Sequence, residues 1–206
     1  MRNILLGLLL PLFLAACGAE PKWAPQEDVD RVRYRADGPP KITLFTVINN
    51  RTDSGAHSAL MINGSQRVIF DPAGTWWHHS IPERNDVHYG ITPRVLAFYV
   101  DYHARETYRV VMQEVIVSPE VAEIALREVQ AHGAVPKAFC ARSVSGILPR
   151  VPGFESIRDT FHPKKLHRQF ARIPGVRERV IRDDDDNARS ALLTARNARP
   201  VPAAGN

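Results

Sequence analysis

The chain has 206 residues, 44% of them hydrophobic and 24% charged, which are the proportions of one globular domain with tails. The formal net charge is +5 at pH 7, and the basic residues are spread along the chain without an interleaved aromatic pattern. This distribution argues against nucleic acid as a partner and leaves only a weak attraction to anionic surfaces.

The first 16 residues have the pattern of an export signal. Arg2 precedes an apolar or small stretch at residues 4–16. That stretch is too short to span a bilayer, because a spanning helix needs about 20 residues. It ends Leu14-Ala15-Ala16-Cys17, and this ending resembles the lipobox of bacterial lipoproteins. The alternative is an ordinary signal peptide with a chance cysteine.

The lipoprotein resemblance implies a mature chain that begins at Cys17 and is anchored in a membrane by acyl chains, palmitate among them, on that residue. Gly18 stands where many lipoproteins of the inner membrane have aspartate. The resemblance therefore implies a cell-envelope protein of the outer membrane that faces the periplasm. More than one acyl chain gives a stable anchor, since each buried methylene contributes about 0.8 kcal/mol.

A tether and three strands are expected in the first half of the mature chain. Residues 17–40 are rich in proline and charge and predict a tether or a loosely packed arm. Residues 75–91 have no apolar period and predict a long loop. Asn63-Gly64 between two apolar runs predicts a hairpin turn. The predicted strands are residues 41–48, 58–62 and 66–70.

Two capped helices follow, with a half-buried strand at residues 107–117 between them. Thr92 and Ser118 are each followed by proline, the pattern of a helix start. Gly133 ends the second helix. The apolar residues at helical spacing are Val95, Phe98, Tyr99 and Tyr102 in the first helix, and Val121, Ile124, Ala125 and Val129 in the second.

A third helix carries Cys140, and short helical stretches continue to about residue 172. Residues 183–206 begin with an acidic run and predict a disordered tail. The order of elements predicts one α+β domain at residues 41–182, in which a small antiparallel sheet is packed with helices on one side.

Cys140 is the first candidate for chemistry. It shares one helix face with Val144, Ile147 and Leu148, which fits a small buried core residue as well as a nucleophile. A position near the helix N-terminus would lower the pKa of the thiol. Pro136 weakens that argument, because a helix beginning there would leave Cys140 a full turn inside. Spacing alone leaves both interpretations open.

His57 and Asp71 favour the nucleophile. His57 begins the strand 58–62, and Asp71 ends the next strand, fourteen residues later. A hairpin that turns at Asn63-Gly64 would place His57 nearly opposite residues 70 and 71. Asp71 would then reach the imidazole. A thiol, an imidazole and a carboxylate that orients it are the parts of a nucleophilic triad.

Three segments together resemble the circularly permuted papain-like domains of the NlpC type, a group that includes relatives of lecithin:retinol acyltransferase. The segments are Gly55-Ala56-His57-Ser58-Ala59-Leu60-Met61-Ile62, Arg67-Val68-Ile69-Phe70-Asp71-Pro72-Ala73-Gly74 and Ala138-Phe139-Cys140-Ala141. In the permuted group the histidine strand precedes the cysteine helix, as here. The resemblance covers about residues 41–148 and implies a permuted papain-like fold.

The resemblance implies Cys140 as nucleophile, His57 as general base and later acid, and Asp71 as the orienting residue. Other members have different polar residues at the third position, and this chain lacks the asparagine that often precedes the cysteine in related acyltransferases. The implied activity is a cysteine hydrolase that cleaves an amide or ester bond, in peptidoglycan stem peptides or in acyl lipids. A non-catalytic envelope lipoprotein that serves as a binding or structural module is the alternative.

His78, His79 and His88 form another cluster that could suggest a metal site. Adjacent histidines of an extended segment point to opposite faces, and no carboxylate has a convincing ligand spacing. We therefore expect no metal and no cofactor, and interpret Trp76 and Trp77 as loop packing or the rim of a cleft.

Overall fold

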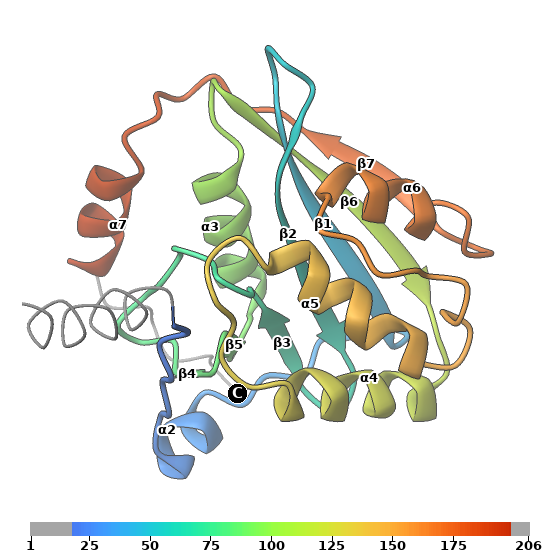
Figure 1. Cartoon of the computed structure of the whole chain (residues 1–206). Helices are drawn as coiled ribbons and strands as arrows, with labels where there is room; N and C mark the ends of the chain where they lie inside the picture. The colour runs from blue at the N-terminus through green and yellow to red at the C-terminus, as the bar shows by residue number, and fades with distance from the viewer. Residues whose placement is uncertain (1–17, 199–206) are drawn as a thin grey trace, which may run out of the picture.

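The computed structural model describes residues 18–198 and has an α+β architecture (Figure 1). The predicted signal peptide and Cys17 lie outside the described residues. A seven-stranded, open, antiparallel sheet forms the centre of the fold, with the strand order β4-β5-β3-β2-β1-β6-β7. Among residues 18–198, no helix has the length and apolar character needed to cross a bilayer.

Seven strands make the sheet, and the three predicted in the first half are among them. β1 is long because β-branched and apolar residues fill most of its length, and the adjacent β2 is apolar from Ala59 to Ile62. The strands are β1 (Lys41–Asn49), β2 (Gly55–Asn63), β3 (Arg67–Phe70), β4 (Glu83–Arg84), β5 (Val87–Tyr89), β6 (Tyr108–Ile116) and β7 (Arg177–Ile181).

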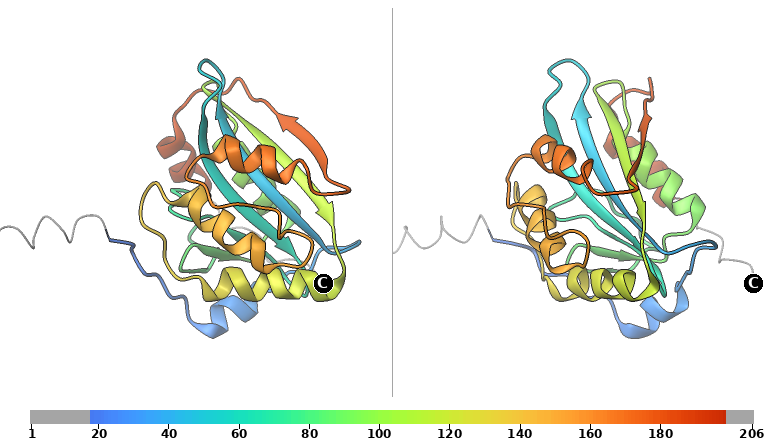
Figure 2. Two further views of the ribbon diagram at one scale, coloured as in Figure 1. Left: turned by 45° about the vertical axis from the view of Figure 1, so that its right-hand side comes forward. Right: turned by 90° about the vertical axis from the view of Figure 1, so that its right-hand side faces the viewer.

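Helices cover both faces of the sheet, so the prediction of helices on one side is wrong. Leu44 belongs to one core cluster and its neighbour Phe45 to the other. Successive residues of a strand point to opposite faces, and both faces of β1 are therefore apolar and need cover. Figure 2 shows α4 (Pro119–Ala131), α5 (Cys140–Ile147) and α6 (Pro163–Phe170) on one face, with α3 (Pro93–His103) and α7 (Arg189–Asn197) on the other.

The two capped helices begin where the sequence predicts. The side chains of Thr92 and Ser118 accept hydrogen bonds from Val95 N–H and Val121 N–H, and each helix has proline in its first turn. The four apolar residues predicted to be buried in α3 are buried. In α4, Ala125 and Val129 are buried as predicted, and Val121 and Ile124 are partly buried against the same core cluster. Ala122 and Leu126 are the other buried residues of this helix.

The ends of the described chain are more ordered than the sequence predicts. Residues 18–40 form a packed arm that contains α2 (Gln26–Arg31), whose Val29 is buried. In this arm Trp23 forms a bridge with Arg84 of β4, and Ala24 N–H donates to Glu83 O at 3.0 Å. β4 and β5 lie within the segment predicted to be a loop.

The predicted disordered tail is wrong for its first part, where Arg189–Asn197 form α7. Leu192 and Leu193 of this helix pack against the same core cluster as α3. In the acidic run before α7, Asp185 accepts from Arg105 at 3.0 Å, and the same guanidinium donates to Asp101 of α3 at 2.7 Å. Residues 199–206 lie outside the described part of the chain.

Candidate active site

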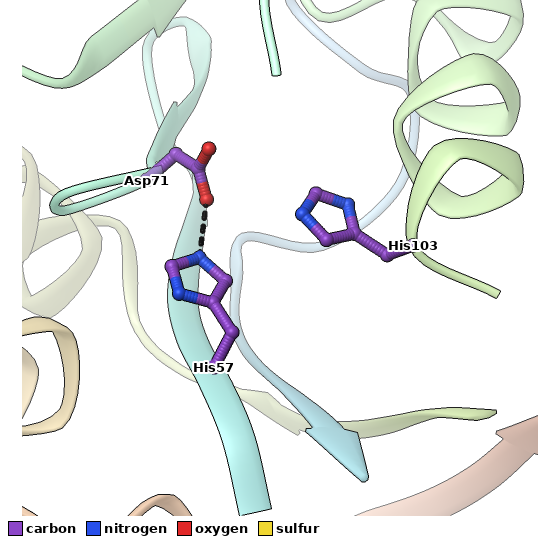
Figure 3. A group of neighbouring side chains, drawn as sticks. All are labelled: His57, Asp71 and His103. Carbon is purple, nitrogen blue, oxygen red and sulfur yellow. Dashed lines mark hydrogen bonds and ion pairs between the residues drawn. The ribbon is translucent and has the colours of Figure 1, made fainter. Parts of the chain in front are cut away.

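His57 and Asp71 are joined directly. His57 Nε2 lies 2.7 Å from Asp71 Oδ1 (Figure 3), and Asp71 is almost completely buried. Burial alone would lower the pKa of His57, but the charge and the hydrogen bond of Asp71, with those of Cys140, raise it to about 10. In the same way, His57 overcomes the effect of burial on Asp71 and holds the pKa of that carboxyl well below its usual range. The pair is therefore an imidazolium and a carboxylate.

The register that brings them together differs from the expected one. His57 lies inside β2, opposite Val47 of β1, and the β2–β3 ladder pairs Leu60 with Phe70. Extending that ladder puts Asp71 opposite Ala59, two residues from His57 and on the same face of the sheet. Diagonal neighbours of this kind lie within reach of long side chains. The predicted contact is confirmed, whereas the predicted opposition of His57 and residues 70–71 is wrong.

Cys140 is the first residue of α5, so the helix does not begin at Pro136. The residue two positions before it, Ala138, has a φ of 69°. A left-handed backbone costs a residue with a Cβ roughly 1–2 kcal/mol, and such strain is concentrated at functional sites. This turn delivers the chain into α5 with the cysteine at its very start.

The thiol of Cys140 lies against the imidazole. Cys140 and His57 lie close enough for each to shift the pKa of the other, and Nδ1 is the ring nitrogen that the bond to Asp71 leaves for the thiol. The ladder between β2 and β3 begins only at Leu60, so the first residues of β2 have no β3 partner and α5 approaches there. Burial raises the pKa of the Cys140 thiol, but the hydrogen bond and charge of His57, with N–H groups of Ser58 and Ala141, outweigh burial and lower it.

Two residues that sequence reasoning missed complete this site. Tyr99 donates its hydroxyl to Asp71 Oδ1 at 2.7 Å, so that oxygen accepts two hydrogen bonds. The ring of His103 stacks on that of His57, with centroids 5.7 Å apart and planes 5° from parallel, and burial lowers the pKa of His103 to about 4. Both residues belong to α3, and their spacing of four residues, which puts them on one helix face, is the only sequence signal that relates them to each other. Nothing in the sequence joins α3 to the hairpin.

Gly74 packs directly against the carboxylate of Asp71. A Cβ at this position would overlap Asp71 Oδ2 and lie 2.8 Å from the backbone oxygen of the same residue, while Gly74 N–H donates to that oxygen at 2.9 Å. The turn after β3 therefore requires glycine for close approach.

We expect Gly74→Ala to displace the Asp71 carboxylate and weaken its bond to His57. The pKa of His57, followed by NMR titration of its ring protons, should fall from about 10 towards the ordinary value of 6.5. Gly146→Ala is the matched control, because a Cβ there meets only Asp159 at 3.9 Å. An unchanged His57 titration in Gly74→Ala would show that the carboxylate tolerates the methyl group.

A cavity of about 240 Å³ opens beside the histidines on the α3 side of the sheet. His57 and His103 line it, with Gly74, Tyr102 and Arg189 of α7. Cys140 is not part of its wall, because α5 approaches from the opposite face. The cavity therefore gives access to the imidazole from the side away from the thiol.

The three histidines of the predicted loop, His78, His79 and His88, do not have the expected arrangement. The rings of His78 and His79 stack with centroids 4.5 Å apart instead of pointing to opposite faces. His88 packs edge-on against the buried Trp76, and Trp77 is exposed. Within residues 18–198, the groups of potential ligands that lie close enough to share a metal ion contain none of these three histidines.

No family model matches the chain, and comparisons with curated proteins and with solved structures give no match either. The chemistry of the site is therefore inferred from its own geometry.

Proposed function

We propose that the protein is a lipid-anchored cysteine hydrolase of the cell envelope, with Cys140 as nucleophile, His57 as base and acid, and Asp71 as the orienting residue. The observation that carries the proposal is the bond between His57 and the buried Asp71 at 2.7 Å, at a position where the same imidazole lowers the pKa of the Cys140 thiol. A permuted papain-like arrangement is part of the proposal. The histidine strand precedes the cysteine helix, and the thiol stands at a helix N-terminus.

The charges of the site suit the first chemical step. A thiolate at Cys140 attacks the carbonyl carbon of an amide or ester, and the proton on His57 Nδ1 passes to the leaving amine or alcohol as its bond to carbon breaks. No side chain of the described residues caps the N-terminus of α5. Its first N–H groups are therefore suited to hold the negative oxygen that develops on the carbonyl.

The second step uses the same imidazole in its neutral form. His57 takes a proton from water, the resulting hydroxide attacks the thioester carbon, and the carbon–sulfur bond breaks to release the acid and restore the thiolate. Asp71 and Tyr99 hold the imidazole and its counter-charge in place through both steps, because the two hydrogen bonds on Oδ1 fix the carboxylate.

Exposed aromatic residues lie next to the thiol on the α5 side. Phe139 directly precedes Cys140, and its ring packs edge-on against Phe161 with centroids 5.2 Å apart. Their exposed fractions are 41% and 52%, which is unusual for phenylalanine. The charge of Arg142, which lies over Phe161, is neutralised by Asp159. This apolar rim supports a substrate with an apolar group near the bond that is cleaved.

The substrate-independent test is the rate of alkylation of Cys140 by iodoacetamide as a function of pH. In the wild type we expect a larger thiolate fraction at pH 7 than a free cysteine has, since His57 lowers the pKa of the thiol. In His57→Ala, only the N–H groups of Ser58 and Ala141 still oppose the effect of burial, so the pKa of the thiol rises. An ordinary thiol is only a few per cent ionised at pH 7, so we expect alkylation to slow about tenfold there, after allowing for the lower nucleophilicity of a low-pKa thiolate.

Two variants serve as controls for the alkylation test. Cys140→Ala reports any reaction of Cys17, and His162→Ala removes an exposed imidazole and should react as the wild type does. If the thiol reacted with the pH dependence of a free cysteine and were indifferent to His57→Ala, the hydrolase proposal would fail and a non-catalytic binding module would be favoured.

A further inference from the structure

Three metal-ligating side chains meet at the wall of the cavity. One ligand atom from each of His57, Asp71 and His103 can be chosen so that all three lie within 4.8 Å of one another. Figure 3 shows the ring of His103, from α3, facing the gap beside the His57–Asp71 pair. His57 and His103 also line the cavity of about 240 Å³, so an ion from solvent has a route to this point.

The hydrogen bonds of His103 prepare it as a ligand. Its Nδ1 lies 2.8 Å from the backbone oxygen of Tyr99. A carbonyl oxygen only accepts, so Nδ1 carries the proton and Nε2 carries the lone pair. Within the described part of the chain, no hydrogen bond occupies Nε2. Histidine ligands of metal ions commonly donate their second ring nitrogen to a backbone carbonyl in this way.

Asp71 supplies the second observation. Its Oδ1 accepts from His57 Nε2 and from the Tyr99 hydroxyl, both at 2.7 Å. Its Oδ2 is buried and has no hydrogen-bond partner among residues 18–198. A buried carboxylate oxygen without a partner is costly, and such an atom calls for a cation, a donor or an ordered water. The exposed fraction of Asp71 is only 1%.

We propose that His57, Asp71 and His103 form a binding site for a divalent transition-metal ion, and that zinc is the best match. Two imidazoles and one carboxylate are a set that zinc accepts, and a fourth position stays open towards the cavity. Tetrahedral zinc holds its ligand atoms about 3.4 Å apart, and the three ligand atoms already lie within 4.8 Å of one another, so small adjustments of the side chains reach the required spacing. Side-chain rotation into the neighbouring cavity allows this movement.

Occupation of the site has a consequence for the thiol, and this part rests on the proposed function. Zinc replaces the proton that His57 Nε2 donates to Asp71, and that proton leaves to solvent. A metal-bound imidazole is no longer held by the carboxylate in the orientation that serves Cys140. We therefore expect the metal to act as an inhibitor of the hydrolase, from the face of the sheet opposite to the substrate.

The test uses Co²⁺ as a spectroscopic substitute for zinc and the full chain carrying Cys140→Ala. Without that thiol, binding does not depend on the nucleophile. We expect visible d–d absorption bands on titration with Co²⁺, and an X-ray absorption spectrum with nitrogen and oxygen ligands that include two imidazoles. Adding His103→Asn should weaken Co²⁺ binding by roughly 100-fold, whereas His79→Asn, at an exposed histidine, should leave it unchanged.

Each outcome decides the proposal. A cobalt site with sulfur ligands, no cobalt spectrum in metal excess, or equal affinity in folded His103→Asn and its parent would overturn it. Circular dichroism checks that His103→Asn is folded, and the ligand count from the absorption spectrum stands without that variant. Alkylation of Cys140 in the metal-free wild type separates the two proposals. An ordinary thiol beside a functioning cobalt site would refute the hydrolase alone.

Discussion

Asp71→Asn is expected to abolish most of the turnover of an activated ester while sparing the first acylation. A p-nitrophenyl ester has a leaving group that needs no proton, so the thiolate can still be acylated and release a burst of nitrophenolate. Release of the acyl group needs His57 as a base, oriented and charge-stabilised by Asp71. Because asparagine is neutral, we expect the steady-state rate to fall by roughly 10²–10⁴-fold.

Stopped-flow absorbance measures both phases of this reaction, and Cys140→Ala gives the background. Asp86→Asn is the matched control. Asp86 lies close to Asp71, whose N–H donates to Asp86 O at 2.8 Å, but its carboxylate accepts from Val135 N–H at 2.7 Å and not from His57. Asparagine can accept the same bond, so the control should keep the wild-type rate. A steady-state rate unchanged in Asp71→Asn would rule out the orienting role.

Phe45→Ala is expected to cost about 3–5 kcal/mol in the free energy of unfolding. The Phe45 ring is 1% exposed and lies in the core cluster between the sheet and α3. It packs edge-on against Tyr99, with centroids 5.4 Å apart, so the cavity left by alanine lies beside the residue that holds Asp71. Urea denaturation followed by circular dichroism measures the loss.

Phe161→Ala makes the same chemical change at an exposed position and should alter stability by less than about 0.5 kcal/mol. Phe45→Leu keeps most of the buried volume and should cost less than about 1.5 kcal/mol. If Phe45→Ala cost no more than Phe161→Ala, the core on the α3 side would be less tightly packed than the structure indicates.

The features of this fold that depend on short stretches of the chain can be predicted from the sequence. The alternating and β-branched runs locate β1, β2, β3 and β6, and the capping residues Thr92 and Ser118 locate two helices. The contact between His57 and Asp71 is also predictable, because it lies within one hairpin. These features depend only on residues close together in the chain, so the local sequence pattern is enough to predict them.

Features that depend on distant segments are not predictable in the same way. β7 is almost entirely exposed and rich in charge, so it has no apolar signal and exists because the edge of β6 is available for pairing. His103 is 46 residues from His57 along the chain and is the last residue of α3, whereas His57 lies in β2. Only the packing of α3 against the sheet brings it to the pair, and that packing depends on the second apolar face of β1.

Because residues 18–40 form a packed arm, only a short segment separates the predicted lipid on Cys17 from the folded domain. Contacts of this arm with the sheet begin at Lys22, whose Nζ donates to Glu83 of β4 at 2.9 Å and whose backbone oxygen accepts from Asn85 N–H at 2.9 Å. Five peptide units separate Lys22 from Cys17, and a fully extended chain covers about 3.5 Å per residue. If Cys17 carries the predicted lipid, the segment between the lipid and the packed arm is no longer than roughly 18 Å, which is much shorter than a free segment of the whole arm would be. The domain would then stay close to the bilayer and act on substrates that come to the membrane surface.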